Sequence, residues 1–177
     1  DDLEIESFGY AIPASFPNSA LSAMLCNDER WGRCNIKSTS LLGNVLAMNQ
    51  AKSFGCQEVV LHKDGFMTEA GASNVFYFDS SGTVRTSSLS ENILPGITRE
   101  ILIKALKDGP YCVKEGNCAI SDFNDSPCIW LTSSTKGILP LTNLIGTDYK
   151  LEENHGGYLE VSKLFNAAMK SHLEVSE

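Results

Sequence analysis

The sequence predicts an α+β fold, with a mixed α/β sheet and packed helices, in a single domain. Its 177 residues fall within the roughly 100–200 residues that single domains commonly hold. A hydrophobic content of 42% is sufficient for a buried core. Short alternating segments typical of strands are interspersed with longer stretches whose apolar residues recur at helical spacing. No repeat, low-complexity tract or internal linker interrupts this pattern.

The first part of the chain predicts a strand, a short apolar piece and a helix. Apolar residues alternate with small or polar ones from Leu3 to Ile12, which is typical of a strand. An apolar piece from Leu21 to Leu25 and a polar loop from Asn27 to Arg30 follow. A helix is expected from Ser38 to Phe54, with Gly55 as its C-terminal cap. Five apolar residues at helical spacing would form its buried stripe: Leu41, Leu42, Val45, Leu46 and Met48.

The middle of the chain predicts antiparallel strands joined by tight turns. A strand from Glu58 to His62 ends at the turn Asp64-Gly65. A strand from Asn74 to Phe78 is separated from another at Thr83 to Thr86 by the turn Ser80-Ser81-Gly82. Since these turn residues favour hairpins, antiparallel pairing is expected.

The last part predicts two helices and two strands. A helix is expected from Thr98 to Leu106, and strands from Tyr111 to Val113 and from Cys128 to Thr132. The final helix should run from Gly157 to about Leu173. Its core-facing residues would be Leu159, Val161, Leu164, Phe165, Ala168 and Met169.

Charge and hydropathy argue against two kinds of partner. The net charge is -8, whereas nucleic-acid binding needs clustered Lys and Arg. No apolar run reaches the roughly 20 residues of a membrane-spanning helix. The start, Asp1 to Glu6, is too acidic for a signal or transit peptide. We therefore expect a cytoplasmic protein, or one in an organelle such as a plastid, with no nucleic acid and no membrane as a partner.

The cysteines and histidines do not have metal-binding spacing. No Cys-x-x-Cys pair occurs, and the histidines His62, His155 and His172 are far apart. A chain of this size does not need disulfides, so free and mostly buried thiols in a reducing compartment are expected. The cysteines are Cys26, Cys34, Cys56, Cys112, Cys118 and Cys128.

Lys37 lies behind a loop and directly before the expected helix, where a side chain can enter a cleft. A lysine amine that is partly desolvated can lose its proton and form a Schiff base with an aldehyde. On spacing alone, however, a solvated surface lysine is the more common outcome.

Glu69 follows the apolar pair Phe66-Met67 and precedes a loop of small residues. A carboxylate at such a strand end can hold a pyridine nitrogen protonated, which makes the ring an electron sink. An exposed glutamate in a turn is the simpler alternative. Asn74 has two alternative roles: to orient this carboxylate or to satisfy backbone groups of the loop.

Two segments are suited to bind a phosphate. Gly96 permits close approach of the backbone, and Ile97 and Thr98 would present amide groups, with the Thr98 hydroxyl, at a helix N-terminus. An ordinary threonine N-cap is the alternative. The hydroxyl-rich stretch after the strand at 128–132 includes Ser133 and Ser134, which could bind phosphate oxygens or simply form a polar turn.

Together these motifs resemble the fold-type-IV pyridoxal-phosphate enzymes, and most nearly the D-amino-acid aminotransferases. The segments Trp31 to Lys37 and Met67 to Asn74 carry the resemblance, which extends from about Cys26 to the last helix. It implies a homodimer with the fold of that family's large domain, acting on an amino acid and a 2-oxo acid. It also implies a Schiff base of pyridoxal 5'-phosphate on Lys37, which then moves the substrate proton.

The resemblance further assigns residues to each part of the cofactor. Glu69 would contact the ring nitrogen with help from Asn74, and Leu94 would pack against the ring. The phosphate would be bound by Gly96, Ile97 and Thr98 together with Ser133 and Ser134. No metal is implied.

The resemblance leaves the reaction and the domain organisation open. The Gly-Gly-Asn-Tyr segment of branched-chain aminotransferases is missing after Lys37, and aminodeoxychorismate lyases share the same lysine and glutamate. Residues 1–25 are expected to be the end of a smaller N-terminal domain and its connection, and residues 26–177 the C-terminal cofactor-binding domain. Without the N-terminal domain, the chain could be an inactive cofactor-binding domain that serves in assembly or regulation.

Overall fold

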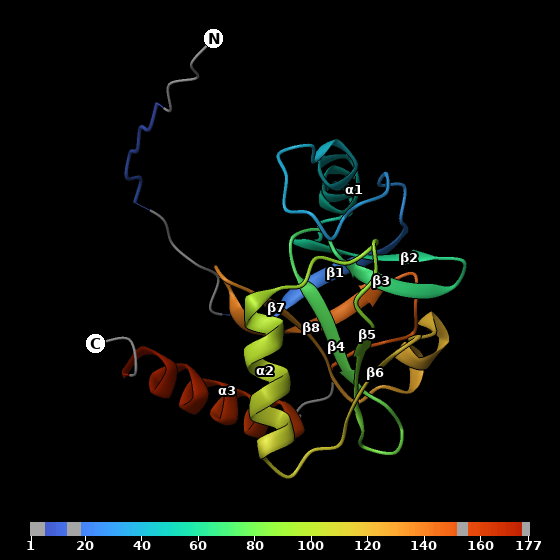
Figure 1. The fold of residues 1–177 in the computed structure, drawn as a ribbon. Coiled ribbons are helices and arrows are strands. Elements are labelled where there is room, and N and C mark those ends of the chain that lie inside the picture. The colour runs from blue at the N-terminus through green and yellow to red at the C-terminus, as the bar shows by residue number, and fades with distance from the viewer. Residues whose placement is uncertain (1–5, 14–18, 152–155, 175–177) are drawn as a thin grey trace.

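A computed structural model describes residues 6–13, 19–151 and 156–174. In this part of the chain, a single mixed sheet has the strand order β3-β2-β1-β8-β7-β4-β5-β6 (Figure 1). Its strands are β1 (Leu21–Asn27), β2 (Glu58–Lys63), β3 (Phe66–Ala70), β4 (Asn74–Phe78), β5 (Val84–Ser87), β6 (Val113–Gly116), β7 (Ile129–Ser133) and β8 (Gly137–Ile145). The helices are α1 (Leu42–Ser53), α2 (Ile97–Asp108) and α3 (Gly156–Glu174), with a short 3-10 helix η1 (Ile120–Asp125). The expected α+β class with a mixed sheet is confirmed.

Alternation along β4 and β7 places two cores on opposite faces of the sheet. Phe76 and Trp130 pair across the strands and pack with Leu102 and Leu106 of α2, while α3 contributes Val161 to the same core. A second core covers the other face and includes Val75, Tyr77, Ile129, Leu131 and, from η1, Phe123. Because side chains in a strand alternate in direction, the even-numbered residues of β4 and β7 face α2.

Several predicted elements are confirmed. The strand predicted at 58–62 and the turn at Asp64-Gly65 are both present, but the hairpin partner is β3, which was not predicted. The two turn residues have φ values of 52° and 81°, as a two-residue hairpin turn requires. β4 and β5 are also antiparallel. Gly55 follows Phe54, the C-cap residue of α1, and has a φ of 79°, as is common for a glycine just past a helix end.

The predicted strand from Leu3 to Ile12 is wrong where the structure describes it. Residues 6–13 have no strand pairing, and Phe8, Tyr10 and Ile12 are exposed to 91%, 79% and 70%. The segment runs outside the body of the domain (Figure 1). An alternating pattern needs a neighbouring strand and a core to become a buried strand, and neither is present here. Residues 3–5 lie outside the described part.

The predicted buried stripe of α1 is also wrong. The helix forms, but Leu41, Leu42, Val45 and Leu46 are exposed and Met48 is only partly buried. The helix packs through Ala51, which is fully buried against Cys56, Val59 and Leu61. The apolar spacing therefore predicts the helix correctly but predicts the wrong buried face. Leu159 of α3, likewise expected in the core, is half exposed.

Other differences concern boundaries and missed elements. The strands β3 and β8 and the short helix η1 were not predicted, and the apolar piece expected at 21–25 belongs to the strand β1. The strand expected at 111–113 lies at Val113–Gly116. β1 starts at Leu21 and pairs with both β2 and β8, so this strand runs across the expected division between residues 25 and 26. All six cysteines are free, and four of them are buried. None of the described helices has the length and apolar character to cross a membrane.

Candidate functional site

Glu69, in β3, is buried and receives three hydrogen bonds. Arg30 Nη1 donates to Oε1 over 2.5 Å, while the Leu94 amide and Asn74 Nδ2 donate to Oε2 over 3.0 and 3.2 Å. An ionised carboxylate has about four acceptor positions, so Oε1 keeps one for a further donor. The expected strand-end carboxylate is thus confirmed in position, and it is neither exposed nor in a turn.

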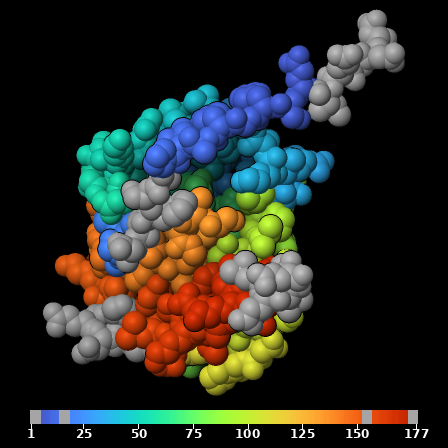
Figure 2. Space-filling model, turned by 90° about the vertical axis from the view of Figure 1, so that its left-hand side faces the viewer, coloured from blue at the N-terminus to red at the C-terminus, as the bar shows by residue number. Residues whose placement is uncertain are grey.

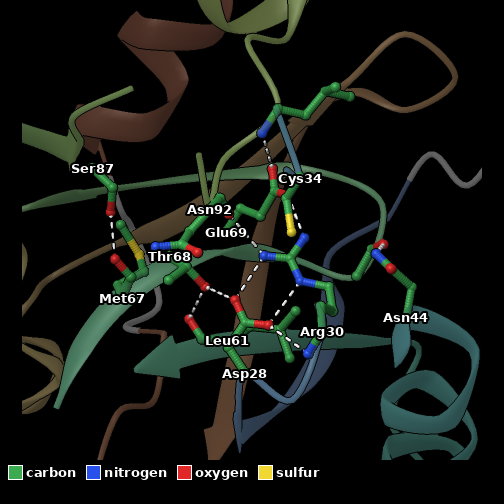
Figure 3. Close-up of polar contacts among 12 residues, drawn as sticks. Asp28, Arg30, Cys34, Asn44, Leu61, Met67, Thr68, Glu69, Ser87 and Asn92 are labelled. Carbon is green, nitrogen blue, oxygen red and sulfur yellow. Dashed lines mark hydrogen bonds and ion pairs between the residues drawn. The ribbon is translucent and has the colours of Figure 1, made fainter. Parts of the chain in front are cut away.

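Arg30 links Glu69 to a second buried carboxylate, Asp28. Its Nε and Nη2 donate to the two oxygens of Asp28 over 2.8 and 2.7 Å, and Nη2 also donates to the Asn92 carbonyl over 2.9 Å. Thr68 donates its hydroxyl to Asp28 over 2.7 Å. Figure 3 shows the guanidinium between the two carboxylates. The sequence analysis did not predict the ion pair between Asp28 and Arg30. The polar loop of mixed charge that contains both residues, directly after a buried strand, was a signal for it.

The pKa values of the two buried carboxyl groups, Glu69 and Asp28, are shifted in opposite directions. Burial raises the pKa of Glu69 above its ordinary value, and the hydrogen bond and charge of Arg30 only partly oppose this. Burial acts in the same direction on Asp28, but the hydrogen bonds from Arg30 and Thr68 prevail and lower its pKa. The pKa of Arg30 itself is raised, because the two carboxylates outweigh its desolvation. A single guanidinium therefore balances two buried carboxyl groups, and Asp28 is held more firmly in its ionised form.

Asn74 connects Glu69 to the start of α2. Besides Glu69, its Nδ2 donates to the Leu94 carbonyl over 2.9 Å. Its Oδ1 lies only 2.3 Å from the position that a Cβ on Gly96 would occupy. Gly96 is the N-cap of α2, and no side chain caps the helix there. The structure thus brings together Glu69, Asn74, Leu94 and Gly96, and leaves the first amides of α2 available to an anion.

Substitution of Gly96 by alanine is expected to disturb both the start of α2 and the contact between Asn74 and Glu69. The new methyl group would displace the Asn74 amide, so we expect the free energy of unfolding to fall by about 1–3 kcal/mol, the usual cost of overpacking. Gly32→Ala is the matched control, because no atom lies within 4 Å of its added Cβ. Thermal unfolding of the two variants checks this. Equal melting temperatures would contradict the close approach.

The predicted residue Ser133 is the last residue of β7, and Ser134 lies in the turn that follows. Ser133 Oγ accepts the Lys136 amide over 3.1 Å and lies 3.4 Å from Thr135 Oγ1. Lys136 Nζ reaches Glu58 Oε2 of β2 over 2.5 Å. The turn is thus fastened to the opposite half of the sheet by an ion pair that was not predicted.

Lys37 lies in the loop before α1, and its side chain is exposed. No hydrogen bond or ion pair joins its ammonium group to a residue that the structure describes. Three residues earlier, Cys34 lies beside Arg30 and Glu69 (Figure 3), and both of their charges act on the pKa of its thiol, which burial raises. The loop that carries Lys37 therefore passes over the Glu69 network, although Lys37 itself makes no contact with it.

A cavity of about 360 Å³ lies between α1 and the strands β1 and β2. Arg30 and His62 line it together with Trp31, Leu42 and Leu46. It shares Arg30 with the network, but Glu69 does not line it. Across the described ranges 6–13, 19–151 and 156–174, no group of three or more His, Cys, Asp and Glu side chains could hold a metal ion.

The family model for amino-transferase class IV matches residues 6–144. The chain belongs to the class IV aminotransferase family, whose members depend on pyridoxal phosphate.

Relatives and solved structures agree with this assignment. A D-alanine aminotransferase of Listeria innocua is 38% identical over 125 residues, which cover 71% of this chain and 43% of that protein. One from Staphylococcus epidermidis is 32% identical over 137 residues, covering 77% and 48%. A hypothetical aminotransferase from Mycobacterium tuberculosis, in a PLP-bound form, superimposes with a TM-score of 0.77 at 21% identity, covering 87% of this chain and 57% of that one. The chain spans about half the length of the relatives it matches.

Proposed function

We propose that this chain is the cofactor-binding domain of a pyridoxal 5'-phosphate-dependent aminotransferase of the D-amino-acid type. The observation that carries the proposal is Glu69: a buried carboxylate with one acceptor position left, tied through Asn74 to an uncapped helix start. The D-alanine aminotransferases that are 30–38% identical over about 70% or more of the chain support the substrate class.

The residues present fit this cofactor. Glu69 Oε1 can accept the N–H of a pyridine ring, and Leu94 lies next to Glu69 through its amide. Gly96, Ile97 and Thr98 offer the α2 amides to the phosphate, as Ser133 and Ser134 could from the β7–β8 turn. When bound, the cofactor supplies an electron sink for the carbanion at the substrate α-carbon.

The chain's own side chains then have three tasks in this proposal. The Lys37 amine would hold the cofactor through its aldehyde group and, once released from it, would move the proton at the substrate α-carbon. Glu69, as a carboxylate, keeps the ring nitrogen protonated. Arg30 favours the ionised form of Glu69 and so opposes the burial that raises its pKa.

We also propose an amino acid and a 2-oxo acid as substrates, a homodimer, and a smaller N-terminal domain that completes the cleft. Exposed apolar side chains support a partner surface near the cavity. Trp31, Leu42 and Leu46 line the cavity, and each of these side chains is more than half exposed. The free cysteines support a reducing compartment such as the cytoplasm.

Reductive trapping tests this proposal. After incubation with pyridoxal phosphate and treatment with borohydride, peptide mapping should find the label on Lys37, and Lys37→Ala should lose it. Lys63→Ala, an exposed lysine at the end of β2, is the control and should keep it. In the whole protein, D-alanine with a 2-oxo acid should be converted and L-leucine should not. Label spread over several lysines, or unchanged in Lys37→Ala, would rule out the assignment.

A further inference from the structure

Arg30 is shared unequally between two buried carboxylates. Asp28 accepts hydrogen bonds from Nε and Nη2 on its two oxygens, over 2.8 and 2.7 Å, whereas Glu69 accepts only from Nη1, over 2.5 Å. Two parallel bonds between a guanidinium and one carboxylate fix the plane of the guanidinium. Asp28 therefore sets the orientation in which Arg30 meets Glu69.

Asp28 is itself held in its ionised form. The Thr68 hydroxyl donates to its Oδ2 over 2.7 Å, and the Arg30 amide donates to its Oδ1 over 3.2 Å. Burial raises the pKa of Asp28, but the hydrogen bonds from Arg30 and Thr68 outweigh burial and lower it. Thr68 directly precedes Glu69 in β3, so one strand contacts both ends of the network (Figure 3). Asp28 thus stays negatively charged at neutral pH.

The network has fewer positive charges than carboxylates. Within the part of the chain that the structure describes, Arg30 is the one lysine or arginine that forms an ion pair with Asp28 or Glu69. With both carboxylates ionised, one negative charge is left unbalanced among side chains that are only 5–7% exposed. An unbalanced buried charge is unfavourable. Burial and the charge of Asp28 accordingly raise the pKa of Glu69, against the opposing effect of Arg30.

The other titratable group beside Glu69 does not change this balance. Residues 31–40 form the loop over the network and lie at the surface (Figure 2). Cys34 belongs to this loop, and burial raises the pKa of its thiol. The thiol is therefore neutral at neutral pH, and the further donors to Glu69 are the neutral Asn74 side chain and the Leu94 amide.

A ligand cation at Glu69 would supply the missing positive charge. Oε1 keeps an acceptor position for one more donor. A protonated ring nitrogen bonded there would give two cations for two carboxylates. Without Asp28, the charges of Arg30 and Glu69 would balance each other, and a protonated ring would place an excess positive charge in a buried site.

We propose that Asp28 is a positioning residue that balances the charge of Arg30 and so reserves the charge of Glu69 for a protonated ring nitrogen. Asp28 acts through Arg30 and makes no contact with the cofactor. The identity of the cofactor rests on the proposed function. The coupling between Asp28 and Glu69, however, is a property of the ligand-free protein and can be tested there.

The variant Asp28→Asn tests this coupling without any cofactor. It leaves one guanidinium with one carboxylate, which is a balanced pair, so the variant should fold. The proton affinity of Glu69 should fall about tenfold or more, because a neighbouring negative charge is lost. A pH titration followed by NMR of isotope-labelled glutamate carboxyl groups measures it, and Glu69→Gln identifies the signal of Glu69 by its absence.

Two further variants complete this titration. Asp28→Ser removes the same charge with a smaller side chain, so it should lower the proton affinity of Glu69 in the same direction. Asp79→Asn is the matched control, because Asp79 forms its ion pair with Arg85, over 3.8 Å. It also removes one carboxylate next to an arginine, and it should leave the proton affinity of Glu69 unchanged.

The same charge should be detectable on the bound cofactor. With pyridoxal phosphate that is isotope-labelled at the ring nitrogen, NMR reports the protonation of that atom without turnover. In Asp28→Asn the ring nitrogen should lose its proton at a lower pH than in the wild type, with a proton affinity that is about tenfold lower or less. A variant that only loosened the packing would not shift this titration.

The outcomes separate the proposal from the proposed function. If the proton affinity of Glu69 is unchanged or higher in Asp28→Asn and Asp28→Ser, the proposal is overturned. It is also overturned if Glu69 responds but the labelled ring nitrogen titrates as in the wild type. If Glu69 responds and borohydride treatment leaves no label on Lys37, Asp28 does balance Arg30 and only the proposed function fails.

Discussion

Replacement of Arg30 by methionine is expected to lower the free energy of unfolding by about 3–5 kcal/mol at neutral pH. Arg30, Asp28 and Glu69 have side chains that are 5–7% exposed, and the guanidinium is the cation bonded to both carboxylates. Without it, two buried carboxyl groups remain with no cation between them. Breaking a buried pair by removing one partner is costly because the uncompensated charge stays buried.

The cost of Arg30→Met should depend on pH. In the wild type, Asp28 has a lowered pKa, so its contribution to stability is present above its unfolded pKa and is lost as pH falls through its folded pKa. Glu69 has a raised pKa, so its contribution is present at low pH and is lost as pH rises through its folded pKa. In the variant, both carboxyl groups lose the charge that favours ionisation, and both pKa values should rise. The deficit should therefore shrink as the pH falls from about 7.5 to 5.

Urea unfolding of wild type and variant at both pH values measures this. Arg85→Met is the matched control, because Arg85 is partly exposed and lies 3.8 Å from Asp79. Such pairs near the surface contribute about 0–1 kcal/mol. An Arg30→Met deficit as small as that of Arg85→Met, or one that does not change with pH, would contradict the role of Arg30.

Replacement of Lys136 by methionine should have an effect of similar size, about 3–5 kcal/mol. Glu58 is fully buried, and Lys136 Nζ is its charged partner at 2.5 Å. Ser73 Oγ, 3.4 Å from the carboxylate, offers only a neutral and long hydrogen bond. The single variant leaves a buried charge, whereas the double variant Glu58→Gln/Lys136→Met leaves none and should regain much of the loss.

Denaturant titrations of the single and double variants check this expectation. Lys163→Met is the control, because Lys163 and Glu160 are 73% and 59% exposed, and its loss should have little effect. If the double variant is as unstable as Lys136→Met, the cost comes from lost packing and not from an unpaired carboxylate.

The elements and residues that could be predicted are those with local signals. The hairpin at Asp64-Gly65 follows from two residues that tolerate positive φ, and α2 follows from a glycine, a threonine and an apolar stripe. The same holds for Glu69 and Asn74, which lie five residues apart on either side of one loop. Their assignment as cofactor ligands came from the family resemblance, and it stays a prediction.

The features that could not be predicted depend on residues distant in the chain. Arg30 and Glu69 are separated by 39 residues, and Glu58 and Lys136 by 78. In neither pair does the local sequence around one residue indicate its partner, because strand order decides which charges meet. The exposed face of α1 has the same cause: spacing indicates a helix, but only the packing of Ala51 shows which side is buried.

Asn74 gives the site a fixed length. One amide group touches the carboxylate proposed for the ring nitrogen and the turn proposed for the phosphate, so these two positions move together. A ligand with a longer arm between its ring and its anionic group would have to detach Asn74 from one of them. The Asn74 side chain therefore fixes the distance between the two positions. The protein should discriminate between cofactor analogues by the length of the link between ring and anionic group, as well as by their charge.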